Sequence, residues 1–126
     1  MPYFVVWKNG IPAGKPYDGL VSSLDIFATA IDAASISKTR NRLDGVSLLP
    51  YLKGKKGEPH KVLYWRKMDT RAIRSGDYKL IITHGVDSVL YNIRRDPEEM
   101  NNLINKEPDL YLSLIHISEP TRPISI

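Results

Sequence analysis

The hydrophobic positions in the first half of the chain repeat at helical spacing in one segment. Between Leu24 and Ala34 the apolar residues recur every three or four positions, which is typical of a helix with one buried face. Ser22 precedes this segment and Asp25 follows three residues later, in the arrangement of a helix-capping box. The Asp25 carboxylate would also lie at the positive end of the helix dipole. The pattern predicts a helix that begins at about Ser23, with Asp25 as a helix-start residue and not a metal ligand.

Two shorter apolar segments lie on either side of this helix. Tyr3–Trp7 is a continuous run of aromatic and β-branched residues, which is typical of a strand buried on both faces of a sheet. Ser47–Leu52 is predicted to be at most a short helix, because Pro50 is tolerated only in a first turn. Lys53–His60 is a charged loop with two glycines and a proline, so we expect a boundary between two parts of the chain there. A lone loop histidine such as His60 is expected to be solvated.

After this loop the hydrophobic pattern changes to short segments separated by turn residues. The residues between the turns predict four strands, at Val62–Arg66, Arg71–Arg74, Tyr78–Thr83 and Val89–Ile93. Ser75–Asp77 has the glycine of a tight hairpin turn. Pro108–Leu114 begins with a proline at a position that a first helical turn accepts, and is predicted to be a final helix. The second half therefore predicts a small antiparallel sheet of four strands with a C-terminal helix.

Composition removes several classes of function. The chain has no cysteine, which excludes disulfides, thiolate metal sites and a cysteine nucleophile. No apolar run approaches the ~20 residues that span a membrane, so no membrane association is expected. The net charge is +4, but the basic residues are scattered along the chain and do not form a patch. Nucleic-acid binding is therefore not expected.

The connection between the first two predicted strands concentrates basic residues. Arg66 and Arg71 lie there, and a guanidinium binds an oxyanion such as sulfate with paired donors, so both are candidates for substrate binding. His84 follows the third predicted strand and is a further candidate, because histidine exchanges protons near neutral pH. The alternative is an exposed charged turn without function. Arg74 and Lys79 flank the hairpin turn and are expected to make charge pairs on a solvated face.

Four blocks of sequence follow one another at characteristic spacings: VSSLDIFATA from Val21, LDGVSLLPYLKG from Leu43, RSGDYKLI from Arg74, and LYNI-x-x-DPEE-x-x-NL from Leu90. Together they resemble the C-terminal third of type I sulfatases, the arylsulfatase family of the alkaline-phosphatase-like superfamily. The resemblance covers about Pro2 to Tyr111. It implies an α/β fold in which residues 1–54 are the end of the mixed-sheet catalytic domain. Residues 59–111 would form an α+β C-terminal subdomain, with a four-stranded antiparallel sheet and a C-terminal helix.

The resemblance also implies a reaction, the hydrolysis of sulfate esters of a small molecule or a carbohydrate. In these sulfatases a formylglycine made from the Cys or Ser of a C/S-x-P-x-R motif attacks sulfur, while a Ca²⁺ held by Asp and Asn residues stabilises the sulfate charge. Neither the nucleophile nor the calcium ligands are expected in this chain, so it is expected to be a fragment that is inert alone. The family implies a periplasmic or secreted enzyme, although no targeting signal is recognised in this sequence itself.

Two alternatives stay open beside a sulfatase fragment. One is a fragment of a related phosphonate or phosphate ester hydrolase, and the other is a non-enzymatic binding module.

The end of the chain differs in character from the rest, because Leu112–Arg122 resembles the translation of a sequencing adaptor. Residues 112–126, with His116, are therefore expected to be a non-native tail. Ser118–Arg122 fits S-x-P-x-R by its letters, which we interpret as a coincidence.

Overall fold

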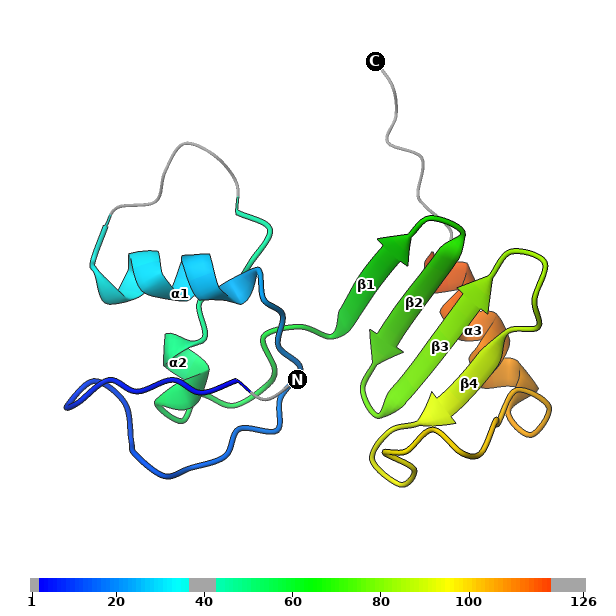
Figure 1. The fold of residues 1–126 in the computed structure, drawn as a ribbon. Helices are drawn as coiled ribbons and strands as arrows, with labels where there is room; N and C mark the ends of the chain where they lie inside the picture. Colours follow the sequence, from blue (N-terminus) through cyan, green and yellow to red (C-terminus); the bar gives the residue numbers. More distant parts are fainter. Residues whose placement is uncertain (1–2, 37–42, 119–126) are drawn as a thin grey trace, which may run out of the picture. The chain divides into compact units, whose positions relative to one another are not determined.

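The structure is a computed structural model that describes residues 3–36 and 43–118. The chain divides into two compact units, Met1–Lys61 (unit 1) and Val62–Ile126 (unit 2). Figure 1 shows the helices and strands of each unit. The division follows directly after the charged loop in which the sequence predicts a boundary. Each unit is described by itself below.

Unit 1 contains two helices that pack against each other, α1 (Asp25–Ala33) and α2 (Leu49–Leu52). Both helices were predicted, and Pro50 lies in the first turn of α2. The buried face of α1 differs from the predicted apolar stripe, because Phe27 is 61% exposed whereas the buried residues are Asp25, Ala28 and Thr29. Polar contacts of Asp25 and Thr29, described below, decide which side of α1 packs inward.

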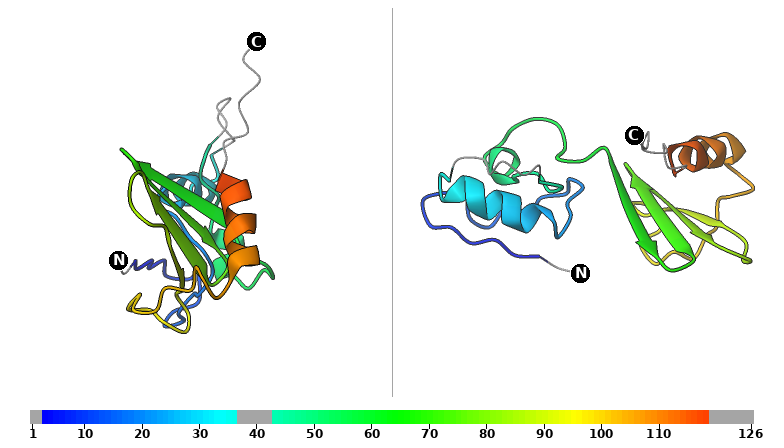
Figure 2. Two further views of the ribbon diagram at one scale, coloured as in Figure 1. Left: turned by 90° about the vertical axis from the view of Figure 1, so that its right-hand side faces the viewer. Right: turned by 90° about the horizontal axis from the view of Figure 1, so that it is seen from above.

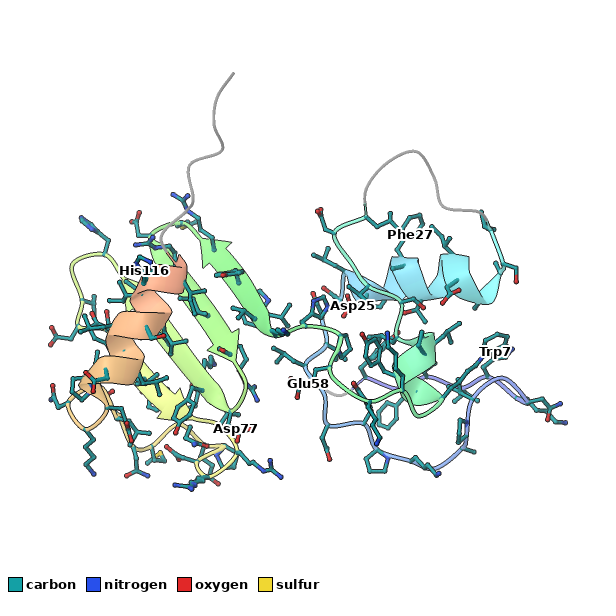
Figure 3. All side chains as sticks on the ribbon, turned by 180° about the vertical axis from the view of Figure 1, so that it is seen from behind. Trp7, Asp25, Phe27, Glu58, Asp77 and His116 are labelled. Carbon is teal, nitrogen blue, oxygen red and sulfur yellow. The ribbon has the colours of Figure 1, made fainter. Side chains whose placement is uncertain are left out.

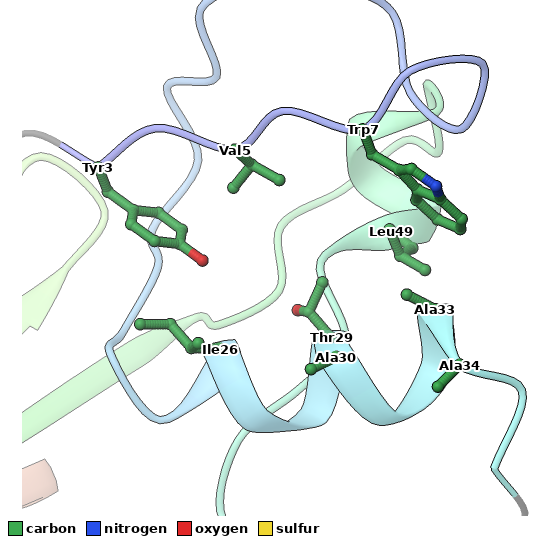
Figure 4. A pocket seen from close by; sticks show the side chains of 9 residues that line it. All are labelled: Tyr3, Val5, Trp7, Ile26, Thr29, Ala30, Ala33, Ala34 and Leu49. Carbon is green, nitrogen blue, oxygen red and sulfur yellow. The ribbon is translucent and has the colours of Figure 1, made fainter.

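The segment Tyr3–Trp7 is extended but belongs to no strand of a described sheet. The side chains of Tyr3, Val5 and Trp7 turn toward α1, as Figure 4 shows, and line an apolar groove. Phe4 and Val6 are 85% and 93% exposed. The prediction of a strand buried on both faces is therefore wrong for this structure, because no neighbouring strand covers the second set of side chains.

Unit 2 is a four-stranded antiparallel sheet with strand order β1-β2-β3-β4, followed by one helix. The elements are β1 (Val62–Lys67), β2 (Thr70–Ser75), β3 (Tyr78–Thr83), β4 (Val89–Asn92) and α3 (Pro108–Ser118). Gly76 has a φ of 55° in the two-residue turn between β2 and β3, a conformation that glycine adopts without strain. The predicted antiparallel sheet, hairpin and C-terminal helix are confirmed.

Helix α3 covers one face of this sheet, as both views in Figure 2 show. The core between them consists of Ile73, Leu80, Leu90 and Leu114, each at most 2% exposed. Leu114 lies in the part of the chain expected to be a non-native tail. Residues 112–118 are helical here and contribute this core side chain, so for the fold they are part of unit 2; the last eight residues lie outside the described part. The origin of the tail sequence stays a prediction.

Of the two residues expected to make charge pairs beside the hairpin turn, Lys79 forms an ion pair and Arg74 forms none with a described residue, and the pair at Lys79 does not run across the two strands. The Arg74 side chain donates a hydrogen bond from Nε to the Gly76 carbonyl, 3.0 Å away. Lys79 forms an ion pair with Glu99, which reaches it from the loop after β4. The two cations sit opposite each other in the register, so each needs a partner from outside the strand pair.

None of the helices in the described ranges is both long and apolar enough to cross a membrane.

Candidate functional site

The three residues predicted to bind substrate lie at one end of the sheet in unit 2. Arg66 and Arg71 are Cα partners across β1 and β2, one position before the pair that closes the hairpin. His84 follows β3, and its backbone N–H donates to the carbonyl of Asp69 in that hairpin, 3.1 Å away. Both arginines and His84 are exposed. Backbone pairing thus brings together side chains that the sequence separates by up to eighteen positions.

The two arginines share the face on which α3 packs, because side chains alternate along a strand and Ile73 lies two positions from Arg71. Like charges directly opposite each other in a sheet destabilise the pairing. Neither guanidinium forms an ion pair with a residue that the structure describes. A bound anion between Arg66 and Arg71 would remove this repulsion, and paired N–H donors suit a sulfate group.

Unit 1 has a second cluster, centred on the carboxylate of Asp25 at the start of α1 (Figure 3), which is fully buried. Its Oδ2 accepts the Ser22 backbone N–H at 2.7 Å, and its Oδ1 accepts the Val46 backbone N–H at 2.9 Å. His60 Nε2 lies 2.8 and 2.9 Å from the two oxygens. The Ser22 contact is one half of the predicted capping box. In place of the other half, Ser22 Oγ accepts the Leu24 backbone N–H at 3.3 Å.

His60 is not the solvated loop residue that the sequence predicts, since only 13% of its side chain is exposed. It reaches Asp25 over 35 residues of chain, a contact without any local sequence signal. The oxygens of Asp25 are occupied by two backbone N–H groups and this imidazole. A buried carboxylate requires such donors, so the pair holds together the α1 start, the segment at Val46 and the end of the loop.

Thr29 extends the same network by one helical turn. Its Oγ1 donates to the Asp25 carbonyl at 2.6 Å and accepts the Leu48 backbone N–H at 2.9 Å. Asp25 and Thr29 therefore satisfy two backbone N–H groups of the segment that leads into α2. This explains why the polar side of α1 faces inward.

Gly45 packs against the backbone at the start of α1, directly before the Val46 N–H that binds Asp25. A Cβ at this position would lie 2.0 Å from the Leu24 carbonyl oxygen, a backbone atom that cannot turn aside. We expect Gly45→Ala to lower the free energy of unfolding of unit 1 by about 1–3 kcal/mol, since the two segments must separate. Denaturant titration of the Trp7 indole N–H resonance measures it.

The control for Gly45→Ala is Asp44→Ala, a neighbouring substitution at an exposed position. Combining Gly45→Ala with Asp25→Ala should give less than the sum of the two effects, because both variants break the same contact. Full additivity of the two would show that the Gly45 contact acts independently of the Asp25 network.

Tyr17, a half-buried residue of unit 1, carries a further buried polar atom. Its hydroxyl oxygen is buried and has no hydrogen-bond partner among the described residues. Burial raises the pKa of the Tyr17 phenol above its usual value of 10.0, and Glu58 and Tyr51 raise it further. The folded state therefore favours the neutral phenol, so the contribution of Tyr17 to the stability of unit 1 is fully present below pH 10.0 and is lost as the pH rises through its raised pKa.

We expect Tyr17→Phe to stabilise unit 1 by about 1 kcal/mol at neutral pH, because it removes a buried hydroxyl without a partner. The variant should also lose less stability than the parent chain between neutral pH and the alkaline range. Urea titrations across this range measure both effects, and Tyr3→Phe, at a half-exposed position, is the control. Destabilisation by Tyr17→Phe would show that the hydroxyl has a partner in solution.

Neither the groove of unit 1 nor the acidic residues in the described ranges form a further candidate site. The groove, of about 480 Å³, is lined by apolar side chains and the hydroxyls of Tyr3 and Thr29, and no charged residue lines it. In the described ranges no three His, Asp or Glu side chains gather as metal ligands. Asp25 is already bound by donors. These residues do not fit a calcium site.

Comparison with known proteins gives the family. The family model described as N-sulphoglucosamine sulphohydrolase, C-terminal, matches residues 1–115. The uncharacterized sulfatase YdeN of Escherichia coli is 53% identical over 66 residues, which are 51% of this chain and 12% of YdeN. Human arylsulfatase K is 30% identical over 121 residues, which cover 83% of this chain and 22% of that enzyme. The chain thus spans less than a quarter of either curated relative.

A solved structure supports the same assignment. The crystal structure of Ps i-CgsB in complex with k-i-k-neocarrahexaose matches with a TM-score of 0.73 and 26% identity, over 90% of this chain and 26% of that one. A match over 90% of the chain includes residues of both units, and unit 2 has the four-stranded sheet and C-terminal helix that the sequence predicts. The predicted resemblance to sulfatases is confirmed. The chain belongs to the sulfatases, in the family of the C-terminal region of N-sulphoglucosamine sulphohydrolase.

Proposed function

We propose that this chain is the C-terminal part of a sulfuric ester hydrolase that acts on a sulfated carbohydrate. The observation that carries the proposal is the pairing of Arg66 with Arg71 beside His84 in a sulfatase subdomain. Ps i-CgsB, whose structure contains a neocarrahexaose, supports a carbohydrate substrate.

In this proposal Arg66 and Arg71 bind an anionic group of the substrate through paired N–H donors. An anion there screens the repulsion between the two opposed guanidinium groups, so binding and sheet stability favour the same arrangement. His84 supplies a hydrogen bond at the edge of the same hairpin. These residues bind and orient substrate, and the chemical step belongs to other groups.

The nucleophile and the metal are assigned to regions of the enzyme outside the matched segment. By the resemblance to sulfatases, a formylglycine would supply the nucleophile and a bound Ca²⁺ would supply positive charge for the sulfate oxygens, and none of the residues proposed here would hold either group. We propose that this chain alone has no sulfatase activity and that the complete enzyme is periplasmic or secreted.

The test is to sequence the genomic locus beyond both ends of this reading frame and to express the protein that the full frame encodes. Sulfate release from sulfated oligosaccharides is expected, together with an upstream C/S-x-P-x-R motif. Hydrolysis of phosphonate monoesters without sulfate release would identify the related hydrolase instead. A frame with no further coding sequence would overturn the enzymatic proposal and favour a binding module.

In that full-length enzyme we expect Arg66→Gln and Arg71→Gln each to raise KM about tenfold, the effect of losing one charge-assisted contact of about 1.4 kcal/mol. Arg95→Gln removes the same charge from an exposed position after β4 and is the control. Unchanged KM for both hairpin variants would show that Arg66 and Arg71 form only an exposed charged turn.

A further inference from the structure

The register of the sheet in unit 2 aligns one apolar residue from every strand in a single row. Trp65, Ala72, Ile81 and Val89 are successive Cα partners from β1 to β4. Their neighbours along the strands, such as Leu80, point to the core under α3. Because side chains alternate along a strand, the row lies on the opposite face, here named the open face. The indole of Trp65 on this face is 47% exposed.

Cations lie on both sides of this row. On the hairpin side the next row is formed by Lys67, Thr70 and Thr83, where the two threonine hydroxyls are 3.1 Å apart. On the other side Arg74 and Lys79 are partners, and Glu99 neutralises Lys79. None of the strand residues on the open face is acidic. The face therefore combines one exposed indole with two cations, Lys67 and Arg74, that form no ion pair with a described residue.

We propose that the open face binds a sulfated oligosaccharide, with a sugar ring stacked on Trp65 and sulfate groups bound by Lys67 and Arg74. The inference rests on the proposed function and extends it, because it adds a carbohydrate-binding surface separate from the Arg66–Arg71 pair on the other face. An indole is a rigid apolar plate with one N–H donor, which suits the apolar side and the hydroxyls of a sugar ring. Two hydroxyls beside Lys67 add hydrogen-bond partners for the same ligand.

Charge decides between a sulfated sugar and a protein as occupant. A protein without acidic side chains at the contact would take Lys67 and Arg74 out of water, and no acidic strand residue of the open face compensates them. A second copy of this chain would bring the same positive charges against each other. The row also has a single large exposed side chain, whereas stable protein interfaces use a cluster of anchors. A sulfated chain supplies the missing negative charge.

The experiment titrates the complete 126-residue chain with a sulfated galactan hexasaccharide and follows amide and indole resonances by NMR. We expect saturable shifts at Trp65, Lys67 and Arg74, with an affinity that falls as salt is added. The desulfated hexasaccharide should bind at least about tenfold more weakly, if each lost charge contact is worth about 1.4 kcal/mol. Inorganic sulfate alone should not shift the Trp65 indole signal.

Two variants test the residues. Trp65→Ala should weaken binding about tenfold or more, whereas Tyr64→Ala, at an exposed neighbour on the opposite face, should not. The double variant Lys67→Gln/Arg74→Gln should also lose binding. Its control, Arg95→Gln/Lys106→Gln, removes equal charge from exposed positions of unit 2 outside the sheet and should keep it.

Several results would overturn the inference. One is a set of shifts that does not saturate. Another is an equal loss of binding in the charge variant and its control. A third is concentration-dependent dimerisation through Trp65. Circular dichroism tests whether each variant is folded. If Trp65→Ala does not fold, the two charge variants still test the inference. If the full-length enzyme releases sulfate but the open face does not bind the hexasaccharide, the inference about the open face is wrong and the proposed function stands. If the open face binds the hexasaccharide but the full-length enzyme releases no sulfate, the proposed function is wrong and the binding surface stands.

Discussion

Replacing Asp25 with alanine is expected to lower the free energy of unfolding of unit 1 by about 3–5 kcal/mol, because three donors lose their common acceptor and each unsatisfied buried group costs about 1–3 kcal/mol. The carboxylate is fully buried and accepts hydrogen bonds from Ser22, Val46 and His60. Without it, two backbone N–H groups and an imidazole lose their acceptor in the interior. A unit of about sixty residues has little stability to spare, so we expect unit 1 to unfold while unit 2 stays folded.

The measurement is a urea titration followed at two indole N–H resonances, Trp7 for unit 1 and Trp65 for unit 2. Asp32→Ala is the matched control, since it removes a carboxylate from an exposed position of the same helix. A double-mutant cycle with His60→Ala isolates the coupling between the two side chains. An equal effect of Asp25→Ala and Asp32→Ala would show that the buried network contributes nothing beyond helix capping.

Replacing Leu80 with alanine is expected to destabilise unit 2 by about 2–5 kcal/mol, as large-to-small substitutions in a core do. Leu80 has no exposed surface and belongs to the cluster formed with Ile73, Leu90 and Leu114. The truncation leaves a cavity between the sheet and α3, because strands held by hydrogen bonds cannot close over it. The effect should appear in the Trp65 signal and not in that of Trp7.

Ile81→Ala is the control for Leu80→Ala, because Ile81 is the next residue of β3 and lies on the open face, where it is only half-buried. We expect a smaller loss from Ile81→Ala, since water fills the space that the side chain leaves. Equal losses for the two variants would contradict the assignment of the core to the face under α3.

The elements of unit 2 could be predicted because their signals are local. Alternation of apolar residues and the hairpin turn at Gly76 marked the strands, and β3 has the predicted bounds. Strands β1 and β2 extend one residue closer to their hairpin than predicted, to Lys67 and from Thr70, because their pairing with each other sets their ends. The predicted C-terminal helix continues beyond Leu114 to Ser118, and Ile115 in this extension packs against the same core.

The contacts of unit 1 could not be predicted in the same way. His60 was expected to be solvated, yet it binds Asp25 across 35 residues, and no periodicity carries that information. The apolar stripe of α1 was expected to face the interior, but the structure buries Asp25 and Thr29 and leaves Phe27 exposed. Buried hydrogen-bond acceptors for Val46 and Leu48 outweigh the apolar pattern of a single short helix.

The sequence by itself determined the two helices of unit 1, the antiparallel sheet of unit 2 with its helix, and the sulfatase family, because these depend on residues that are close along the chain or on motifs in fixed order. Only the tertiary structure decided which side chains meet. Strand register placed Arg66 opposite Arg71 and aligned the row that contains Trp65 on the open face. Burial of one carboxylate selected His60 as its partner, because an interior charge is stable only where donors from distant segments reach it.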